Sequence, residues 1–137
     1  VMTTISFVVD GPPVPKARPR LGKHGTYTPE KTKAHEEAMG WAAKQAMSDA
    51  GIEGPLEGPL SASVVFDMEI PKSAPKKKRD AMHGRYHAVR PDTDNLLKTL
   101  DSCNGIAFWD DAQIVSLRAT KWWSKEPKTM VWIRSLS

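Results

Sequence analysis

Carboxylates gather in one short stretch of an otherwise basic chain. Asp92 and Asp94 lie in the segment from Arg90 to Asp101, and Asp111 follows soon after it. The chain carries a net charge of +4, and these carboxylates alone would repel an anionic partner. They become useful if a divalent cation lies between them and a phosphate group. The working hypothesis is therefore cation-assisted chemistry on a phosphate ester.

Asp92, Asp94 and Asp111 form a set of hard oxygen ligands that includes no histidine or thiolate. Such a set suits Mg²⁺ or Mn²⁺, which keep several waters and also bind substrate phosphate oxygens. A cation held in this way can orient and acidify a water and stabilise charge on the phosphoryl oxygens. Lys98, one helical turn beyond Asp94, can add a fixed positive charge to the transition state or help to activate the water.

A purely structural role accounts for the same residues. Asp94 is also a good helix N-cap, and Asp110 with Asp111 also makes a turn. An Asp94–Lys98 pair on a helix surface contributes only about a few tenths of a kcal/mol. Spacing alone does not decide between the two roles, since Asp-X-Asp is a common tripeptide. If Asp94 caps the helix, the turn there can bring the carboxylates of Asp92 and Asp94 toward one point.

The segments that must position these residues show strand and helix patterns. Residues 4–10 are rich in β-branched and aromatic types, and residues 60–70 alternate between apolar and polar, so both predict strands. A helix is expected from Thr28, as its N-cap, to about Ala50. Its apolar residues at helical spacing are Ala34, Ala38, Trp41, Ala42 and Met47.

The acidic segment itself is expected to form a short helix. This helix starts at Thr93 or Asp94 and runs to about Asn104, with Gly105 as its C-cap. Its buried stripe is expected to consist of Leu96, Leu97 and Leu100. Strands are expected later in the chain over residues 106–109, 113–123 and 130–133.

Two basic clusters precede the acidic segment. The first, residues 16–20, lies in a loop stiffened by prolines, so little conformational entropy is lost when the loop binds a ligand. This favours contact with phosphate groups over a loop that is only solvated. The second, residues 72–79, is the densest positive charge in the chain and is expected to be a mobile loop without a ligand. The predicted DNA-binding residues are Lys16, Arg18, Arg20, Lys76, Lys77, Lys78 and Arg79.

The size and composition predict one ordinary globular domain over residues 1–137. The chain is 39% hydrophobic and 26% charged, values typical of such a domain. No apolar run approaches the ~20 residues that cross a bilayer, and nothing reads as a signal peptide. A cytoplasmic location without a membrane partner is therefore expected. The single Cys103 cannot form an internal disulfide and is expected to be an inert packed thiol.

Three motifs together resemble the signature of the RusA-type Holliday-junction resolvases, the crossover junction endodeoxyribonucleases. The block from Arg90 to Lys98 is similar to that family's Lys/Arg-Pro-Asp-X-Asp-Asn-X-X-Lys motif. Asn104-Gly105 and the block from Asp110 to Ile114 follow in the same order and with the right gap. Residues 11–20 and the basic run at 71–79 also resemble the family, so the resemblance covers most of the chain.

The resemblance implies a small α+β domain in which a mixed β-sheet packs with two main helices. It implies a homodimer that binds branched DNA. With Mg²⁺ as its cofactor, or Mn²⁺ as a substitute, this dimer would cut four-way junctions by paired symmetric nicks during DNA recombination and repair. Lys98 would be the essential base or transition-state cation, and Asn95 would support the site. The implied metal ligands are Asp92, Asp94 and Asp111, assisted by Asp110.

Two other functions stay open. One is a non-catalytic nucleic-acid-binding module with structural carboxylates, and the other is a nuclease that acts on flaps or forks. The sequence does not separate these substrates, and it gives no cut-site preference or number of metal ions. The family is often encoded by phages or prophages, so such an origin and work on the bacterial nucleoid are expected. Trp122, Trp123 and Trp132 are expected in the core or a dimer contact, with a base-stacking wedge as the alternative.

Overall fold

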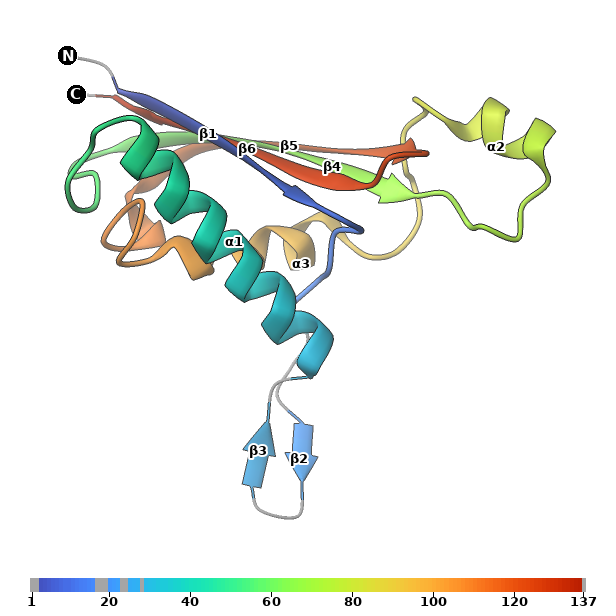
Figure 1. The fold of residues 1–137 in the computed structure, drawn as a ribbon, viewed down its shortest axis with the longest axis horizontal. Coiled ribbons are helices and arrows are strands. Elements are labelled where there is room, and N and C mark those ends of the chain that lie inside the picture. The colour runs from blue at the N-terminus through green and yellow to red at the C-terminus, as the bar shows by residue number, and fades with distance from the viewer. Residues whose placement is uncertain (1–2, 17–19, 23–24, 28, 137) are drawn as a thin grey trace.

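One layer of the fold is a four-stranded mixed sheet (Figure 1). In chain order its strands are β1 (Thr4–Asp10), β4 (Leu60–Glu69), β5 (Ile114–Ser124) and β6 (Lys128–Ser135). The strand order across the sheet is β1-β6-β4-β5; β4 and β5 are parallel, and the other pairs are antiparallel. The computed structural model describes residues 3–16, 20–22, 25–27 and 29–136. The expected mixed sheet of an α+β fold is confirmed.

The second layer is helical and covers one face of the sheet (Figure 1). It contains α1 (Glu30–Asp49) and α3 (Thr93–Leu97), and α3 continues into the 3-10 helix η1 (Lys98–Cys103). These are the two main helices that the sequence predicts. A third helix, α2 (Lys76–Met82), lies beyond the end of β4, and a short hairpin of β2 (Arg20–Gly22) and β3 (Gly25–Tyr27) projects from the helical side.

Alternating side chains of the strands build the core. On β4 the expected inward side chains are buried, including Val64 and Phe66 at 1% exposure each. The helical layer closes over them with Leu96 and Leu100, two of the three leucines predicted for the stripe of the acidic helix. Full burial of each such side chain contributes roughly 1.5–3 kcal/mol to stability. The start of α3 is therefore anchored to the sheet through its apolar side.

The buried face of α1 differs from the predicted one. Trp41 is 68% exposed, and Ala34 and Ala38 also face solvent. The buried side chains of α1 are instead Thr32, His35, Met39, Ala43 and Met47. Turning the helix to bury Trp41 would remove the two methionines from the core. The small Ala43 also lets the helix approach the sheet closely, so packing has overridden the simple count of apolar residues.

Two further expectations are wrong. Residues 106–109 form a turn with isolated bridges from Phe108 to Leu56 and Asn104, and no strand. The basic run is no simple loop, because its second half forms α2, which begins directly after Pro75. Lysine has a good helix propensity, and proline is compatible with a helix start, which explains why like charges did not prevent the helix.

Cys103 is fully buried, as expected of a packed thiol. Burial, assisted by the negative charge of Asp101, raises the pKa of this thiol to about 12. The thiolate is therefore absent at neutral pH, and the residue offers no nucleophile. Among the residues that the structure describes, no helix is both long and apolar enough to cross a membrane.

Two buried histidines predict a pH-dependent stability. His35 is 8% exposed and His87 is 6% exposed, and each has one ring nitrogen without a hydrogen-bond partner. Burial lowers the pKa of both below the ordinary value of 6.5, and for His87 the charge of Lys121 adds to this effect. Below about pH 6.5 the unfolded chain therefore binds more protons than the folded one, so stability falls as the pH falls.

Urea unfolding at about pH 7.5 and about pH 6.0 measures this effect, since ordinary carboxylates titrate below that window. The free energy of unfolding should be lower at the acidic pH. The variant His35→Leu keeps the site apolar and removes one titrating group, so its pH dependence should be shallower than that of wild type. Equal pH dependence in the two proteins would contradict a neutral, buried His35.

Candidate active site

The two carboxylates of the acidic segment lie exposed at the start of α3. The N-cap residue is Asp92, with φ −67° and ψ 144°, and it makes no side-chain capping hydrogen bond. Asp94 lies in the first turn and does not cap this helix, so the structural alternative of an Asp94 cap is excluded. Within the described part of the chain, neither carboxylate forms an ion pair or a side-chain hydrogen bond. The local structure therefore makes no use of either carboxylate.

Lys98 and Asn95 are linked to each other at the same site. The Lys98 ammonium donates to Asn95 Oδ1 at 3.1 Å and forms no ion pair with Asp94. The Asn95 backbone carbonyl accepts from the Lys16 backbone N–H at 3.1 Å. Asn95 thus joins the exposed lysine to the loop that follows β1. Its role as a supporting residue stays a prediction that this geometry favours.

Lys16 is held by carboxylates. Its ammonium forms an ion pair with Asp101 and lies 3.8 Å from Glu36 Oε1. The hydrogen bond to Asp101 raises the pKa of Lys16, against a smaller opposing effect of burial. Lys16 therefore ties the loop after β1 to both α1 and η1. No local sequence pattern predicted these contacts, because Lys16 and Asp101 are 85 positions apart.

A cleft of about 560 Å³ lies beside the acidic segment. Its lining residues are Pro15, Lys16, Arg90, Pro91, Asp92 and Asn95. Two cationic side chains and one carboxylate therefore face the same space. Because the Lys16 ammonium is already paired with Asp101, Arg90 is the cation that can attract a phosphate group there, and a divalent cation at the carboxylate can contact the same phosphate.

The second acidic pair is built into a turn. Asp110 Oδ1 accepts from the Ala112 N–H at 2.8 Å and caps the 3-10 helix η2 (Asp111–Gln113). This hydrogen bond lowers the pKa of Asp110. The structural role considered for Asp110 is thus confirmed. The carboxylate of Asp111 is on the exposed side of the same turn.

Gln113 fixes this turn to the rest of the molecule, a role that the sequence did not reveal. Its Oε1 accepts from the backbone N–H groups of Trp109 at 2.8 Å and Asp110 at 3.0 Å. Its Nε2 donates to the carbonyls of Leu56 and Gly58, both at 3.0 Å. All polar atoms of this amide are engaged, so Gln113 sets the position of the second acidic pair.

The described residues contain no ready-made cluster of three or more His, Cys, Asp or Glu side chains that could hold a metal ion. The set of Asp92, Asp94 and Asp111, with or without Asp110, therefore stays a prediction. The chemistry of the donors nevertheless fits Mg²⁺. This ion commonly binds through one or two carboxylates together with waters and substrate phosphates. Asp92 and Asp94 provide two such carboxylates, and neither forms an ion pair with a described residue.

The predicted DNA-binding residues differ in exposure and in whether their side chains already form contacts within the protein. Lys76, Lys77 and Lys78 are exposed on α2. Arg79 is half-buried, and its guanidinium donates to the Pro71 carbonyl at 2.9 Å and so has a structural contact. Arg20 lies on β2, and Arg18 lies outside the described residues. DNA binding by all of these residues stays a prediction.

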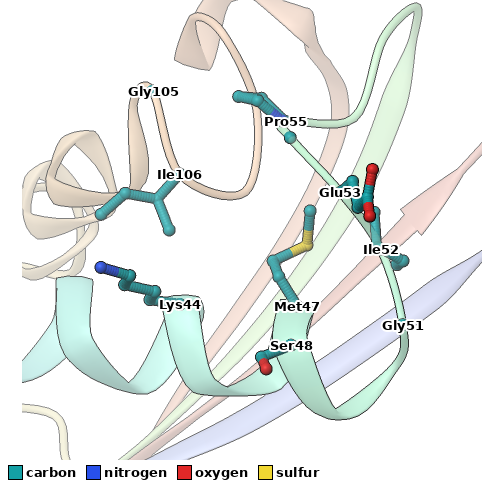
Figure 2. Close-up of a pocket in the computed structure, with 10 residues that line it drawn as sticks. Lys44, Met47, Ser48, Gly51, Ile52, Glu53, Pro55, Gly105 and Ile106 are labelled. Atoms are coloured by element: carbon teal, nitrogen blue, oxygen red, sulfur yellow. The ribbon is translucent and has the colours of Figure 1, made fainter.

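A larger cleft of about 660 Å³ lies elsewhere, at the C-terminal end of α1 (Figure 2). Lys44 and Met47 face it from the helix, Glu53 and Pro55 from the following loop, and Ile106 from the turn opposite (Figure 2). It contains none of the predicted site residues and only one carboxylate. Size alone therefore does not make it the candidate active site.

Comparison with known proteins gives two matches. The model of the family described as endodeoxyribonuclease RusA matches residues 10–134. The uncharacterized protein YqaN of Bacillus subtilis (strain 168) is 34% identical over 145 residues, covering 99% of this chain and 99% of that protein. The family match includes both acidic blocks, the cleft and α2.

Proposed function

Because the chain belongs to the RusA endodeoxyribonuclease family, we propose that it is a Mg²⁺-dependent endonuclease that resolves four-way DNA junctions by paired symmetric nicks. The family is one of Holliday-junction nucleases that bind branched DNA. The observation that carries the proposal is a pair of exposed carboxylates, Asp92 and Asp94, which form no ion pair or side-chain hydrogen bond with the other described residues. They lie beside a cleft that Lys16 and Arg90 also line. Exposed charges without a structural partner at a family signature point to a ligand.

Asp92 and Asp94 would hold the divalent cation, and Asp111, with assistance from Asp110, would complete its protein ligands. When bound, Mg²⁺ supplies an activated water and stabilises negative charge on the phosphoryl oxygens, and Mn²⁺ is expected to substitute for it. The residues of this chain do the rest. Lys98, whose ammonium is exposed and directed by Asn95, would place a positive charge at the reacting phosphate.

DNA binding would rest on cations at two places. Arg90 lies in the cleft, and the lysines of α2 are exposed in a helix that precedes the acidic segment in the chain. Contacts of this kind go to backbone phosphates and favour shape over base sequence. A homodimer would place two such sites around a two-fold axis, which matches the symmetry of a four-way junction. Water attack with loss of the 3′ oxygen would leave ligatable 5′-phosphate and 3′-hydroxyl ends.

Cleavage of end-labelled substrates tests the proposal. A four-way junction, a flap, a fork and a linear duplex of the same sequences would be incubated with the protein and Mg²⁺. We expect cuts at symmetric positions in two opposing strands of the junction and little cutting of the duplex. Preferred cutting of the flap or fork would keep the nuclease and replace the substrate. Junction binding without any cut would favour the non-catalytic binding module.

A further inference from the structure

A segment pairs with the edge of β5 and joins the basic helix to the acidic segment. Residues 84–91, called the connector here, run from the end of α2 to Asp92. The Gly84 N–H donates to the Trp123 carbonyl at 2.9 Å, and the Trp123 N–H donates to the Arg85 carbonyl at 2.8 Å. The His87 N–H donates to the Lys121 carbonyl at 3.0 Å. The first half of the connector is therefore fixed to β5 through its backbone.

Aromatic ring contacts also hold the first half of the connector, on both sides of the sheet edge formed by β5. The Tyr86 ring stacks on Trp122 with centroids 4.4 Å apart and an interplanar angle of 17°. The His87 ring lies against Trp123, with centroids 4.2 Å apart. Both tryptophans are half-buried. Trp122 and Trp123, which were expected in the core or a dimer contact, therefore serve as contact surfaces for the connector.

The second half of the connector is held by one ammonium group. Lys121 Nζ donates to the carbonyls of Val89 at 2.8 Å and Pro91 at 2.7 Å. These two carbonyls flank Arg90, and that of Pro91 directly precedes Asp92. Lys121 lies opposite the buried Phe66 in the β4–β5 register and is itself partly buried. Hydrogen bonds from a charged donor are stronger than neutral ones, and partial burial protects them from water.

We propose that Lys121 is a positioning residue for the active site. By fixing the carbonyls on either side of Arg90, it sets where Arg90 enters the cleft and where the chain turns into Asp92 and α3. The ammonium has three donors and uses two of them on these carbonyls, so a role as a phosphate contact is secondary. The effect of Lys121 on cleavage rests on the proposed nuclease function. Its effect on the position of the backbone does not.

The variant Lys121→Met tests this role, because methionine keeps the apolar stem and removes the charge and the donors. We expect junction cleavage to fall by about 10- to 100-fold, as is typical when a residue that orients metal ligands is lost. Junction affinity without a divalent cation should stay within about threefold of wild type. Lys121→Arg, which keeps charge and donors, should recover part of the activity. The matched control is Lys44→Met, which removes one exposed positive charge from α1.

A second readout does not depend on activity. The Leu96 N–H donates to the Asp92 carbonyl at 3.3 Å and closes the first turn of α3. In metal-free Lys121→Met, hydrogen exchange at this amide should be about tenfold faster or more, while amides of β4 keep their protection. If the methionine variant does not fold, Lys121→Gln, which keeps a neutral donor, carries the same comparison.

The two readouts separate the inference from the proposed function. If wild type cuts junctions and Lys121→Met matches Lys44→Met in both cleavage and Leu96 exchange, the positioning role is wrong and the nuclease function stands. If wild type cuts no junction but Leu96 exchange rises in Lys121→Met, the nuclease function fails and the backbone role of Lys121 stands.

Discussion

Replacing Asp94 with Asn is expected to lower the rate of junction cleavage by about 10³-fold, which corresponds to about 4 kcal/mol of transition-state stabilisation. The substitution keeps the size of the side chain and removes the negative charge that a divalent cation needs. The fold should not change, since the Asp94 carboxylate has no partner among the described residues and does not cap α3. Junction binding should therefore stay within about threefold of wild type. Single-turnover cleavage and a gel-shift titration measure the two quantities.

The matched control is Asp49→Asn. Asp49 is also an exposed aspartate in a helix, but it lies at the far end of α1, where its carboxylate accepts a hydrogen bond from Gln45. This variant loses the same charge and should cut at the wild-type rate. Cleavage by Asp94→Asn at a rate close to that of the control would mean that the carboxylates of the acidic segment are not metal ligands.

The second large effect is expected from the lysines of α2. Changing Lys76, Lys77 and Lys78 together to Gln should weaken junction binding by roughly 10²-fold at moderate salt. The slope of log affinity against log salt should become shallower by up to about 2.7, because each lost phosphate contact contributes about 0.9. Arg79 is kept, since its guanidinium donates to the Pro71 carbonyl and holds the base of the helix.

A matched triple variant on α1 controls for net charge. Lys31, Lys33 and Lys44 are exposed on that helix, and their change to Gln removes the same total charge. If both triple variants lower affinity and salt slope equally, the effect is one of overall charge, and α2 is no specific DNA surface. If only the α2 variant does so, this helix contacts the phosphates.

Much of the sheet could be predicted, because alternation of apolar residues states which side of a strand is buried. This held for β4, whereas β1 was predicted from its β-branched and aromatic residues. The buried face of α1 could not be predicted in the same way. Trp41 is apolar and yet exposed, whereas His35 is polar and buried on the same side as Met39 and Ala43. That depends on tertiary packing and leaves no local pattern.

The acidic segment was located correctly at the start of a short helix, since its residue types and spacing carry the signal. The residues that position it were not found. Lys121 acts on backbone carbonyls 30 and 32 positions away, and Gln113 reaches carbonyls 55 and 57 positions away. A side chain that forms a hydrogen bond with a distant backbone group produces no recognisable spacing pattern in the sequence. Such contacts become visible only when the strands and loops are placed.

One measurement tests the central claim most directly, namely cleavage of a supercoiled plasmid that extrudes a cruciform. Paired nicks across the four-way junction convert this plasmid to a linear form, whereas single nicks give an open circle. We expect a linear product with Mg²⁺ whose ends DNA ligase can seal, and no product with EDTA. Tight binding to the cruciform with no linear product under Mg²⁺ or Mn²⁺ would contradict the assignment of Asp92 and Asp94 to a metal-dependent junction nuclease.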